Sequence, residues 1–265
     1  MFSSQKRKIY LQMLKAVAEA IGPDYLDQVV FVGGCTTVLF MDENDAERIR
    51  HTEDVDLIVS VTAITGYFNF VEVLKTRGFT TPSPINGGDA SVCRLHYGKL
   101  KIDLMPTNGC MGFSNIWYEE AFKHAFKYSI DEQTEIKLFP VEYFLATKFE
   151  AYKSRGEGDL LVSQDIEDVF NVLYSNSNLL LNLIQSKSDV KSYIANSIEE
   201  IQQDYNYDYL LLNMTDGDSD LIAKLSAKIQ NIIDLREFNW LIGQQSKASK
   251  PIQIMTIVIF MILME

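Results

Sequence analysis

Two neighbouring segments constrain the fold of this sequence most, one built on Gly33-Gly34 and the other on Asp54-x-Asp56. Four apolar residues precede the glycines, which predicts a short buried strand, a two-glycine turn and the start of a helix. The aspartates occupy alternate positions of an otherwise apolar strand. Because alternate side chains of a strand point to the same face, we expect both carboxylates to project from one face.

The carboxylates and the glycine turn together predict a site for a metal ion and a phosphate. Like charges this close are unfavourable unless a cation lies between them, and hard carboxylate oxygens suit Mg²⁺. A glycine turn that opens a helix presents free backbone N–H groups, which bind phosphate readily. An anion site beside a divalent-metal site indicates an enzyme that handles a nucleoside triphosphate.

The glycine pair carries meaning only in combination with the aspartates that follow it. The sequence contains neither G-x-x-x-x-G-K-[ST] nor G-x-G-x-x-G, which excludes a P-loop and a dinucleotide-binding fingerprint. Thr36 and Thr37 follow the glycines, and their hydroxyls either add to the phosphate site or cap the start of the helix. Both interpretations of the threonines stay open from sequence.

Composition limits the partners that this chain is expected to have. A net charge of −12 over 265 residues argues against broad binding to nucleic acid or anionic membranes, but allows a site where metal ions supply positive charge. Cys35, Cys93 and Cys110 are odd in number and widely spaced, so neither a zinc site nor a disulfide framework is expected. With a polar, helix-like N-terminus, this pattern favours a cytoplasmic protein.

The C-terminal residues 251–264 form an uncharged, mainly apolar run. This run is too short for a standard transmembrane helix, so no stable membrane association is expected. Its β-branched content predicts a buried strand or a packed terminal helix.

The first half of the sequence alternates between strand and helix patterns. Apolar residues at helical spacing precede the glycine turn and again follow the Asp-x-Asp strand. A loop rich in proline, glycine and asparagine then leads into a hairpin. The expected elements are a helix at 6–21, strands at 29–32 and 54–60, a helix beginning at 36–41, a charged connection at 42–53, a helix at 63–77, a loop at 82–89, paired strands at 91–97 and 100–105, and an edge strand at 136–139.

Pro140 marks a change to helical patterns. The expected elements are a helix at 141–152, a break at 155–159, a helix at 166–173 and helical structure throughout 178–245. We therefore predict an α+β protein. A mixed sheet with flanking helices would occupy residues 1–139, and a mainly α-helical domain that completes the active-site cleft would occupy residues 140–265.

Asp103 is a third acid on a strand that is otherwise apolar. An aspartate within a buried strand is unfavourable without a partner. Metal ions held by Asp54 and Asp56 would stabilise the attacking and leaving oxygens of a displacement at phosphorus. Asp103 would complete this set and accept the proton of the nucleophile. In the structural alternative, Asp54 caps a turn and Asp103 pairs with a basic neighbour such as Lys101.

Lys148 lies in the middle of the apolar stripe of its predicted helix. A lysine that points toward a core needs an anion, and a triphosphate from the first domain would supply one. The alternative is that Lys148 extends its amine to water. Lys153 and Arg155 follow and could reach substrate, or remain solvated charges. Asp165 borders the next apolar stripe and is a further candidate partner for Lys148 or Lys153.

The combination of these motifs resembles the nucleotidyltransferase superfamily, which has the DNA polymerase β-like fold. The matching motifs are Gly33-Gly34, Arg50-x-Thr52-x-Asp54-x-Asp56 and Ile102-Asp103-Leu104. The second half resembles the AbiEii/AbiGii toxin-type branch, in which a lysine helix and an acidic helix complete the cleft. Its matching segments are Tyr143-Phe-Leu-Ala-Thr-Lys-Phe-Glu-Ala-Tyr-Lys-Ser-Arg-Gly, Asp159 and Asp165-Ile-Glu-Asp168. The resemblance covers about residues 29–175.

The resemblance implies transfer of a nucleoside monophosphate from an NTP to a hydroxyl, with Mg²⁺ or Mn²⁺ required and pyrophosphate leaving. The implied metal and catalytic acids are Asp54, Asp56 and Asp103. Together with the residues discussed above, the predicted nucleotide-binding set is Gly33, Gly34, Thr36, Thr37, Arg50, Lys148 and Lys153. Relatives include toxins of toxin–antitoxin and phage-abortive-infection systems, which implies a cognate antitoxin as a partner.

Several functions remain open from sequence alone. The acceptor is RNA or tRNA, a protein, or a small molecule. An antibiotic-modifying transferase is an alternative, because an acidic cleft would suit a cationic aminoglycoside. A catalytically silent nucleotide-binding or interaction module, and a partner-binding protein organised by the apolar C-terminal run, are further alternatives.

Overall fold

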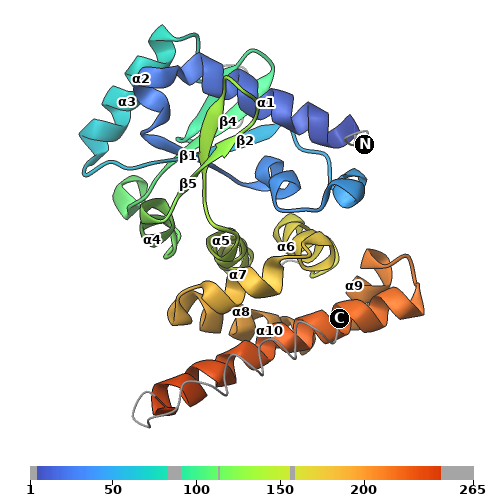
Figure 1. The fold of residues 1–265 in the computed structure, drawn as a ribbon. Helices are drawn as coiled ribbons and strands as arrows, with labels where there is room; N and C mark the ends of the chain where they lie inside the picture. The colour runs from blue at the N-terminus through green and yellow to red at the C-terminus, as the bar shows by residue number, and fades with distance from the viewer. Residues whose placement is uncertain (1–4, 83–90, 113, 156–158, 246–265) are drawn as a thin grey trace.

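The structure, a computed structural model, describes residues 5–82, 91–112, 114–155 and 159–245, with side chains described as far as residue 236. It is an α+β fold that combines a six-stranded mixed sheet with a larger number of helices (Figure 1). The strands are β1 (Val29–Val32), β2 (Asp54–Val59), β3 (Arg94–Tyr97), β4 (Leu100–Pro106), β5 (Phe126–Ser129) and β6 (Glu135–Leu138).

The helices lie close to their predicted positions. Those predicted at 6–21, 63–77, 141–152 and 166–173 are confirmed, and the segment 178–245 is divided into four helices. The α-helices are α1 (Gln5–Ile21), α2 (Pro23–Leu26), α3 (Ile64–Thr76), α4 (Tyr118–Lys123), α5 (Val141–Ser154), α6 (Gln164–Ser175), α7 (Leu179–Gln185), α8 (Ser188–Gln202), α9 (Tyr207–Met214) and α10 (Ser219–Gln245). The 3-10 helices are η1 (Gly34–Leu39), η2 (Glu43–Arg48) and η4 (Gly109–Met111).

The strands follow the order β3-β4-β2-β1-β6-β5 across the sheet. Strand β1 is antiparallel to β2 and parallel to β6, while β2 and β4 run parallel. The predicted hairpin of β3 and β4 is confirmed as an antiparallel pair. The prediction that 136–139 is an edge strand is wrong, because β6 lies between β1 and β5.

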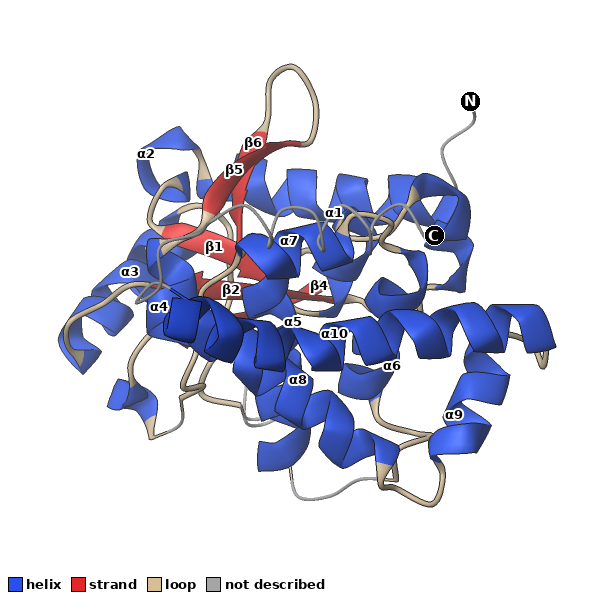
Figure 2. Cartoon of the chain, turned by 60° about the horizontal axis from the view of Figure 1, so that its bottom comes forward, coloured by secondary structure: helices blue, strands red, loops and turns tan. Residues whose placement is uncertain are grey.

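The strand at this edge of the sheet, β5, was not predicted, because its alternation of apolar and polar residues extends over only four positions. It reads Phe-Lys-Tyr-Ser, and three of its four residues are exposed. It pairs with β6 as an antiparallel hairpin. The loop between these two strands protrudes from the body of the molecule (Figure 2).

The segment after the glycine turn is the 3-10 helix η1, whereas the sequence predicted the start of an α-helix. The Thr36 N–H donates to the Gly33 carbonyl over three residues, at 3.1 Å, and the Thr36 hydroxyl donates to the same oxygen at 2.8 Å. The β-branched run that begins at Thr36 also lowers the α-helical propensity of this segment. Tight turns therefore replace the expected helix start.

One apolar core runs through the protein from Tyr10 on α1 to Leu235 on α10. It includes Phe139 and Val141, on either side of the predicted boundary between residues 139 and 140. In the view of Figure 1, α1 to α3 lie above and beside the sheet, and α5 to α10 lie below it. The division into two domains stays a prediction, but the two halves are packed against each other.

Within the described residues, no helix combines the length and the apolar character that crossing a membrane requires. The predicted loop at 82–89 lies almost wholly outside the described residues, as does the apolar run at 251–264.

Candidate active site

The three predicted acids lie together on two adjacent parallel strands. Strands β2 and β4 pair in a register that sets Asp56 opposite Asp103, and Asp54 opposite Lys101. Asp54 and Asp56 are partly exposed, whereas Val55, between them, is buried. This alternation confirms that the two carboxylates share a face of β2, and the register brings Asp103 beside Asp56 on β4.

The glycine turn lies directly against these acids. Gly33 has a φ of +76°, and a Cβ atom added to it would lie 1.7 Å from Asp56 Oδ2. A Cβ on Gly34 would lie 2.1 Å from an Nη atom of Arg50 and 3.3 Å from Asp168 Oδ2. Glycine is therefore required at Gly33, where a positive φ and the close Asp56 carboxylate combine, whereas a side chain at Gly34 would displace the end of Arg50.

The two threonines after the glycines are buried and serve the turn. The Thr36 hydroxyl is occupied by its hydrogen bond to the Gly33 carbonyl. The Thr37 hydroxyl oxygen is buried and finds no hydrogen-bond partner in the described residues. Between the glycines and these threonines, Cys35 is fully buried, and burial raises the pKa of its thiol. A phosphate contact would therefore come from the backbone of the turn rather than from Thr36.

Asp103 is held by Arg94, its neighbour across the β3–β4 hairpin. Arg94 Nε donates to Asp103 Oδ1 at 2.5 Å, and Arg94 Nη2 donates to Oδ2 at 2.9 Å. The alternative of a basic partner for Asp103 is thus confirmed, but the partner is Arg94 and not Lys101. The two residues are opposite each other in the hairpin register.

A second charged group, formed by Arg50, Lys148, Asp165 and Asp168, joins the sheet to the helical half. Lys148 Nζ lies 2.6 Å from Asp168 Oδ2 and 3.1 Å from Asp165 Oδ1. Arg50 also donates to both oxygens of Asp168, at 3.3 Å each. Lys148 is 7% exposed, so the alternative in which its amine extends to water is wrong. The anion that this lysine needs is supplied by α6.

The buried pairs keep both cations charged. Burial alone would lower the pKa of Lys148, but Asp168 and Asp165 raise it above the usual lysine value. Burial likewise opposes the charge of Arg50, and the facing Asp168 carboxylate still raises its pKa. Asp168 is fully buried between the two cations.

Lys153 is not brought together with the other predicted residues. Its Nζ lies 2.6 Å from Glu200 on α8 and 5.1 Å from the centre of the Tyr193 ring. Arg155, in contrast, reaches back to Asp165 at 2.8 Å. Of the two cations at the end of α5, Arg155 therefore belongs to the site.

Neither acid of β2, Asp54 or Asp56, forms an ion pair with a described residue. Burial raises the pKa of Asp56 to about 7, with Lys148 opposing and Asp103 and Asp54 adding to the rise. Asp54 Oδ1 is buried and has no hydrogen-bond partner within the described part of the chain. A buried acceptor without a partner costs about 1–3 kcal/mol, which a bound cation would offset.

The donor set fits Mg²⁺, although the described residues form no complete metal cage. Among the described residues, no three His, Cys, Asp or Glu side chains are arranged so that they could hold a metal ion. Mg²⁺ generally uses only one or two protein carboxylates and completes its shell with water and substrate phosphates. Asp54 and Asp56 supply the oxygens that this ion prefers, and Asp54 has an unpaired oxygen to offer.

The sequence did not predict Arg94 as a site residue, and it did not predict the contact of Asp168 with Lys148. The signal for Arg94 was present, because a two-residue turn at Gly98 and Lys99 sets Arg94 opposite Asp103 by counting along the hairpin. Asp168 is separated from Lys148 by a loop and part of a helix, so only the packing of α5 on α6 reveals their contact.

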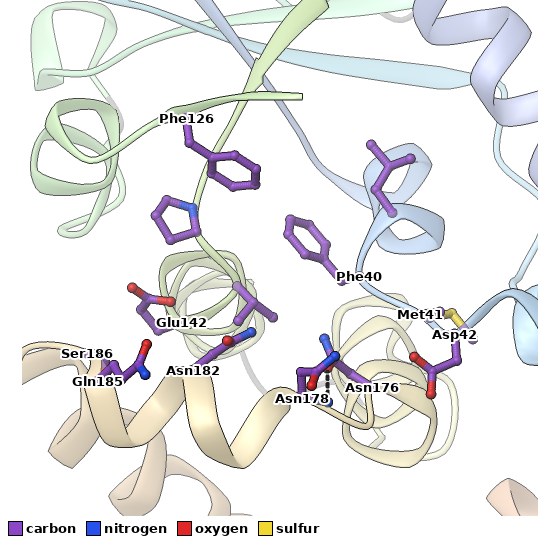
Figure 3. A pocket seen from close by; sticks show the side chains of 13 residues that line it. Phe40, Met41, Asp42, Phe126, Glu142, Asn176, Asn178, Asn182, Gln185 and Ser186 are labelled. Carbon is purple, nitrogen blue, oxygen red and sulfur yellow. Dashed lines mark hydrogen bonds between the residues drawn. The ribbon is translucent and has the colours of Figure 1, made fainter. Parts of the chain in front are cut away.

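A cavity in the described part of the chain lies apart from these residues. It has a volume of about 460 Å³, and Figure 3 shows it between Phe40, Phe126 and the amide side chains of α7 and the preceding turn. None of the predicted site residues lines it. The candidate active site is therefore defined by its charged groups and not by the size of the hollow.

No protein-family model matches the chain, and comparison with curated proteins gives no significant match.

Proposed function

We propose that this protein is a Mg²⁺-dependent nucleotidyltransferase that moves a nucleoside monophosphate from an NTP to a hydroxyl acceptor. The observation that carries the proposal is the register of Asp56 with Asp103, with the Gly33 backbone packed against Asp56. A carboxylate pair beside a glycine turn can bind a cation and the phosphates that accompany it. Asp54 adds a buried oxygen without a partner at the same strand.

The side chains around the acids have separate roles in this proposal. The N–H groups at the start of η1 bind phosphate oxygens, since the first donors of a helix have no acceptor within it. Arg50 supplies positive charge beside Gly34. Asp103 accepts the proton of the acceptor hydroxyl after Arg94 has released it. Mg²⁺, held by Asp54 and Asp56, would supply charge neutralisation for the triphosphate and the leaving pyrophosphate.

Lys148 has a positioning role in this proposal, because its ammonium is committed to Asp165 and Asp168. It fixes Asp168, which in turn fixes the Arg50 guanidinium beside the glycine turn. The helical half therefore controls the geometry of a phosphate-binding arginine that belongs to the first half of the chain.

The test is a labelling assay with each of the four α-³²P-labelled NTPs, Mg²⁺ and a cell extract. The products are then separated into RNA, protein and small-molecule fractions. We expect label in one fraction, and its loss with Asp54→Ala or Asp56→Ala. Asp208→Ala serves as the control, because Asp208 is an exposed acid on α9. Labelling that survives both strand substitutions contradicts the proposed catalytic acids.

A catalytically silent nucleotide-binding module is the second candidate, and the Arg94–Asp103 pair favours it. Both Asp103 oxygens accept hydrogen bonds from Arg94, as they would in a site that has lost its catalytic acid. Mg²⁺-dependent NTP binding without transfer of label to any fraction would support this candidate. Transfer of label would exclude it. The fraction that carries the label would identify the acceptor class, including the small-molecule class of an antibiotic.

A further inference from the structure

A second cavity, of about 340 Å³, lies between η2, α6 and α9. Its apolar walls include Leu160, Leu210 and Met214, and α6 contributes Glu167 and Asn171. The two polar residues are four positions apart on one helix, so their side chains lie one turn apart on the same face. The cavity therefore combines apolar walls with a polar edge.

Asn171 has a hydrogen-bonding capacity that the protein does not use. Its side chain is 2% exposed, and its Nδ2 atom is buried without a hydrogen-bond partner among the residues that the structure describes. Buried amide donors are satisfied in most proteins, so an exception that lines a cavity indicates a missing acceptor. A ligand in the cavity would supply that acceptor.

Glu167 is half-buried and has no ion-pair partner among the described residues. The nearby guanidinium of Arg48 does not neutralise it, because Arg48 donates to the Met214 carbonyl and to Asp216, both at 2.7 Å. Arg48 also lies over the Tyr174 ring. Burial is the main cause that raises the pKa of Glu167, and the negative charge of the neighbouring Asp168 raises it further. The Glu167 carboxylate can therefore accept a hydrogen bond from an N–H group of a ligand.

A ligand for this cavity needs a flat apolar body and an edge that carries a donor beside an acceptor. An aliphatic molecule would leave Glu167 and Asn171 buried without partners, and a simple cation would satisfy only Glu167. The pairing edge of a nucleobase offers an N–H donor next to an acceptor, and its faces are apolar. The walls formed by Leu160 and Met214 suit such faces.

The cavity lies close to the proposed phosphate site. Glu167 directly precedes Asp168, which holds Arg50, and Arg50 lies against Gly34. Glu167 also acts electrostatically on the Arg50 guanidinium. Helix α6 therefore presents one face to the phosphate site and an adjoining face to the cavity.

We propose that this cavity binds the base of the nucleoside triphosphate, with Glu167 accepting from a ring or amino N–H and Asn171 donating to the adjacent acceptor. This inference rests on the proposed function, since it assumes that the triphosphate occupies the site beside Gly33 and Gly34. Glu167 and Asn171 would then set the affinity of the site for the base.

The test compares the binding of each NTP with that of inorganic tripolyphosphate, in Mg²⁺, by isothermal titration calorimetry. The Asn171→Leu variant keeps the volume of the side chain and removes the amide. We expect its NTP affinity to fall about tenfold, as for the loss of one or two hydrogen bonds, while its tripolyphosphate affinity is unchanged. Its thermal midpoint should not fall, because the substitution removes an unsatisfied buried donor.

Glu167→Gln is the second variant, because it keeps the shape of the side chain and changes its acceptor capacity. It should also bind NTP about tenfold more weakly with unchanged tripolyphosphate affinity. Asn182→Leu is the matched control, since Asn182 lines the separate cavity of Figure 3. It should bind both ligands as the unaltered protein does.

The outcomes separate this proposal from the proposed function. If the unaltered protein binds NTP and tripolyphosphate with Mg²⁺, but Asn171→Leu and Glu167→Gln bind NTP normally, the base site is wrong and the phosphate site stands. If the unaltered protein binds neither ligand, the proposed function is wrong, and the base site fails with it.

Discussion

Arg94 donates two hydrogen bonds to Asp103 across the β3–β4 hairpin, one to each carboxylate oxygen. The Asp103 side chain is 22% exposed and that of Arg94 is 12% exposed, so water weakens this pair only in part. Asp103 is also the register partner of Asp56, which forms no comparable ion pair with any residue that the structure describes. A metal ion that used Asp103 would therefore compete with Arg94.

Replacing Arg94 by methionine should increase the affinity for a divalent metal in the absence of nucleotide. The substitution frees both Asp103 oxygens, and hydrogen bonds of this charged type contribute about 1.5–3 kcal/mol, so a gain of about tenfold or more is expected. Mn²⁺ titration followed by electron paramagnetic resonance measures it. Arg94→Lys keeps the charge and should bind Mn²⁺ nearly as the unaltered protein does. Equal affinity in all three proteins would show that Asp103 is not a metal ligand.

Replacing Lys148 by methionine should destabilise the protein. The substitution leaves Asp165 and Asp168 buried with one less cation, and removal of one partner of a buried ion pair costs about 3–5 kcal/mol. Urea unfolding at pH 7 measures this loss. The double variant Lys148→Met/Asp168→Asn should recover part of the lost unfolding free energy, because the charged carboxylate of Asp168 is then replaced by a neutral amide.

Lys191→Met is a matched control for the lysine substitution. Lys191 is also 7% exposed, but the partner of its Nζ is the Ile184 carbonyl, at 3.0 Å. Burial lowers the pKa of Lys191, so its charge is poorly compensated. The loss of stability should stay within about 1 kcal/mol, the value of a single hydrogen bond. Equal losses in the two variants would mean that the acids of α6 do not need Lys148.

Replacing Gly33 by alanine should disrupt the site through the contact with Asp56. The added methyl would lie 1.7 Å from Asp56 Oδ2, on a backbone with a φ of +76°. We expect a loss of about 2 kcal/mol or more in unfolding free energy, together with loss of NTP binding. Gly98→Ala has a similar strain, with a φ of +59°, but meets no atom within 4 Å. It should cost about 1 kcal/mol and leave NTP binding intact.

The sequence was sufficient for features that depend on local periodicity. Alternation along β2 predicted a common face for Asp54 and Asp56, and the turn at Gly98 predicted the hairpin that carries Asp103. Most helices were predicted for the same reason, since their apolar stripes repeat at the helical period. These features need no knowledge of which elements pack together.

The sequence could not show which partner satisfies each buried charge. Lys148 needed an anion, and a substrate phosphate and Asp165 were both open from its helical position. The structure adds Asp168, which reaches Lys148 because α5 packs against α6. Likewise, the parallel register of β2 and β4 places Asp56 beside Asp103. Parallel strands are not joined by a tight turn, so their register cannot be obtained by counting residues from a turn.

The pKa of Asp56, raised by burial from 3.8 to about 7, makes the stability of the metal-free protein depend on pH. Ionisation is disfavoured in the folded state, so this contribution is present below pH 4 and is lost as the pH rises toward 7. A pKa shift of this size corresponds to a change of about 4 kcal/mol in the free energy of unfolding. Because Asp56 keeps some contact with solvent, we expect a change on the order of 2 kcal/mol.

Urea unfolding between pH 4 and pH 8 tests this dependence in the unaltered protein and in Asp56→Asn. The variant cannot ionise at this position, so its stability should fall less over the same range. Mg²⁺ binds the ionised carboxylate, and should therefore restore stability at pH 8 in the unaltered protein but not in Asp56→Asn. Identical pH profiles for the two proteins would mean that Asp56 is ionised throughout, which would remove the electrostatic reason for a cation at this strand.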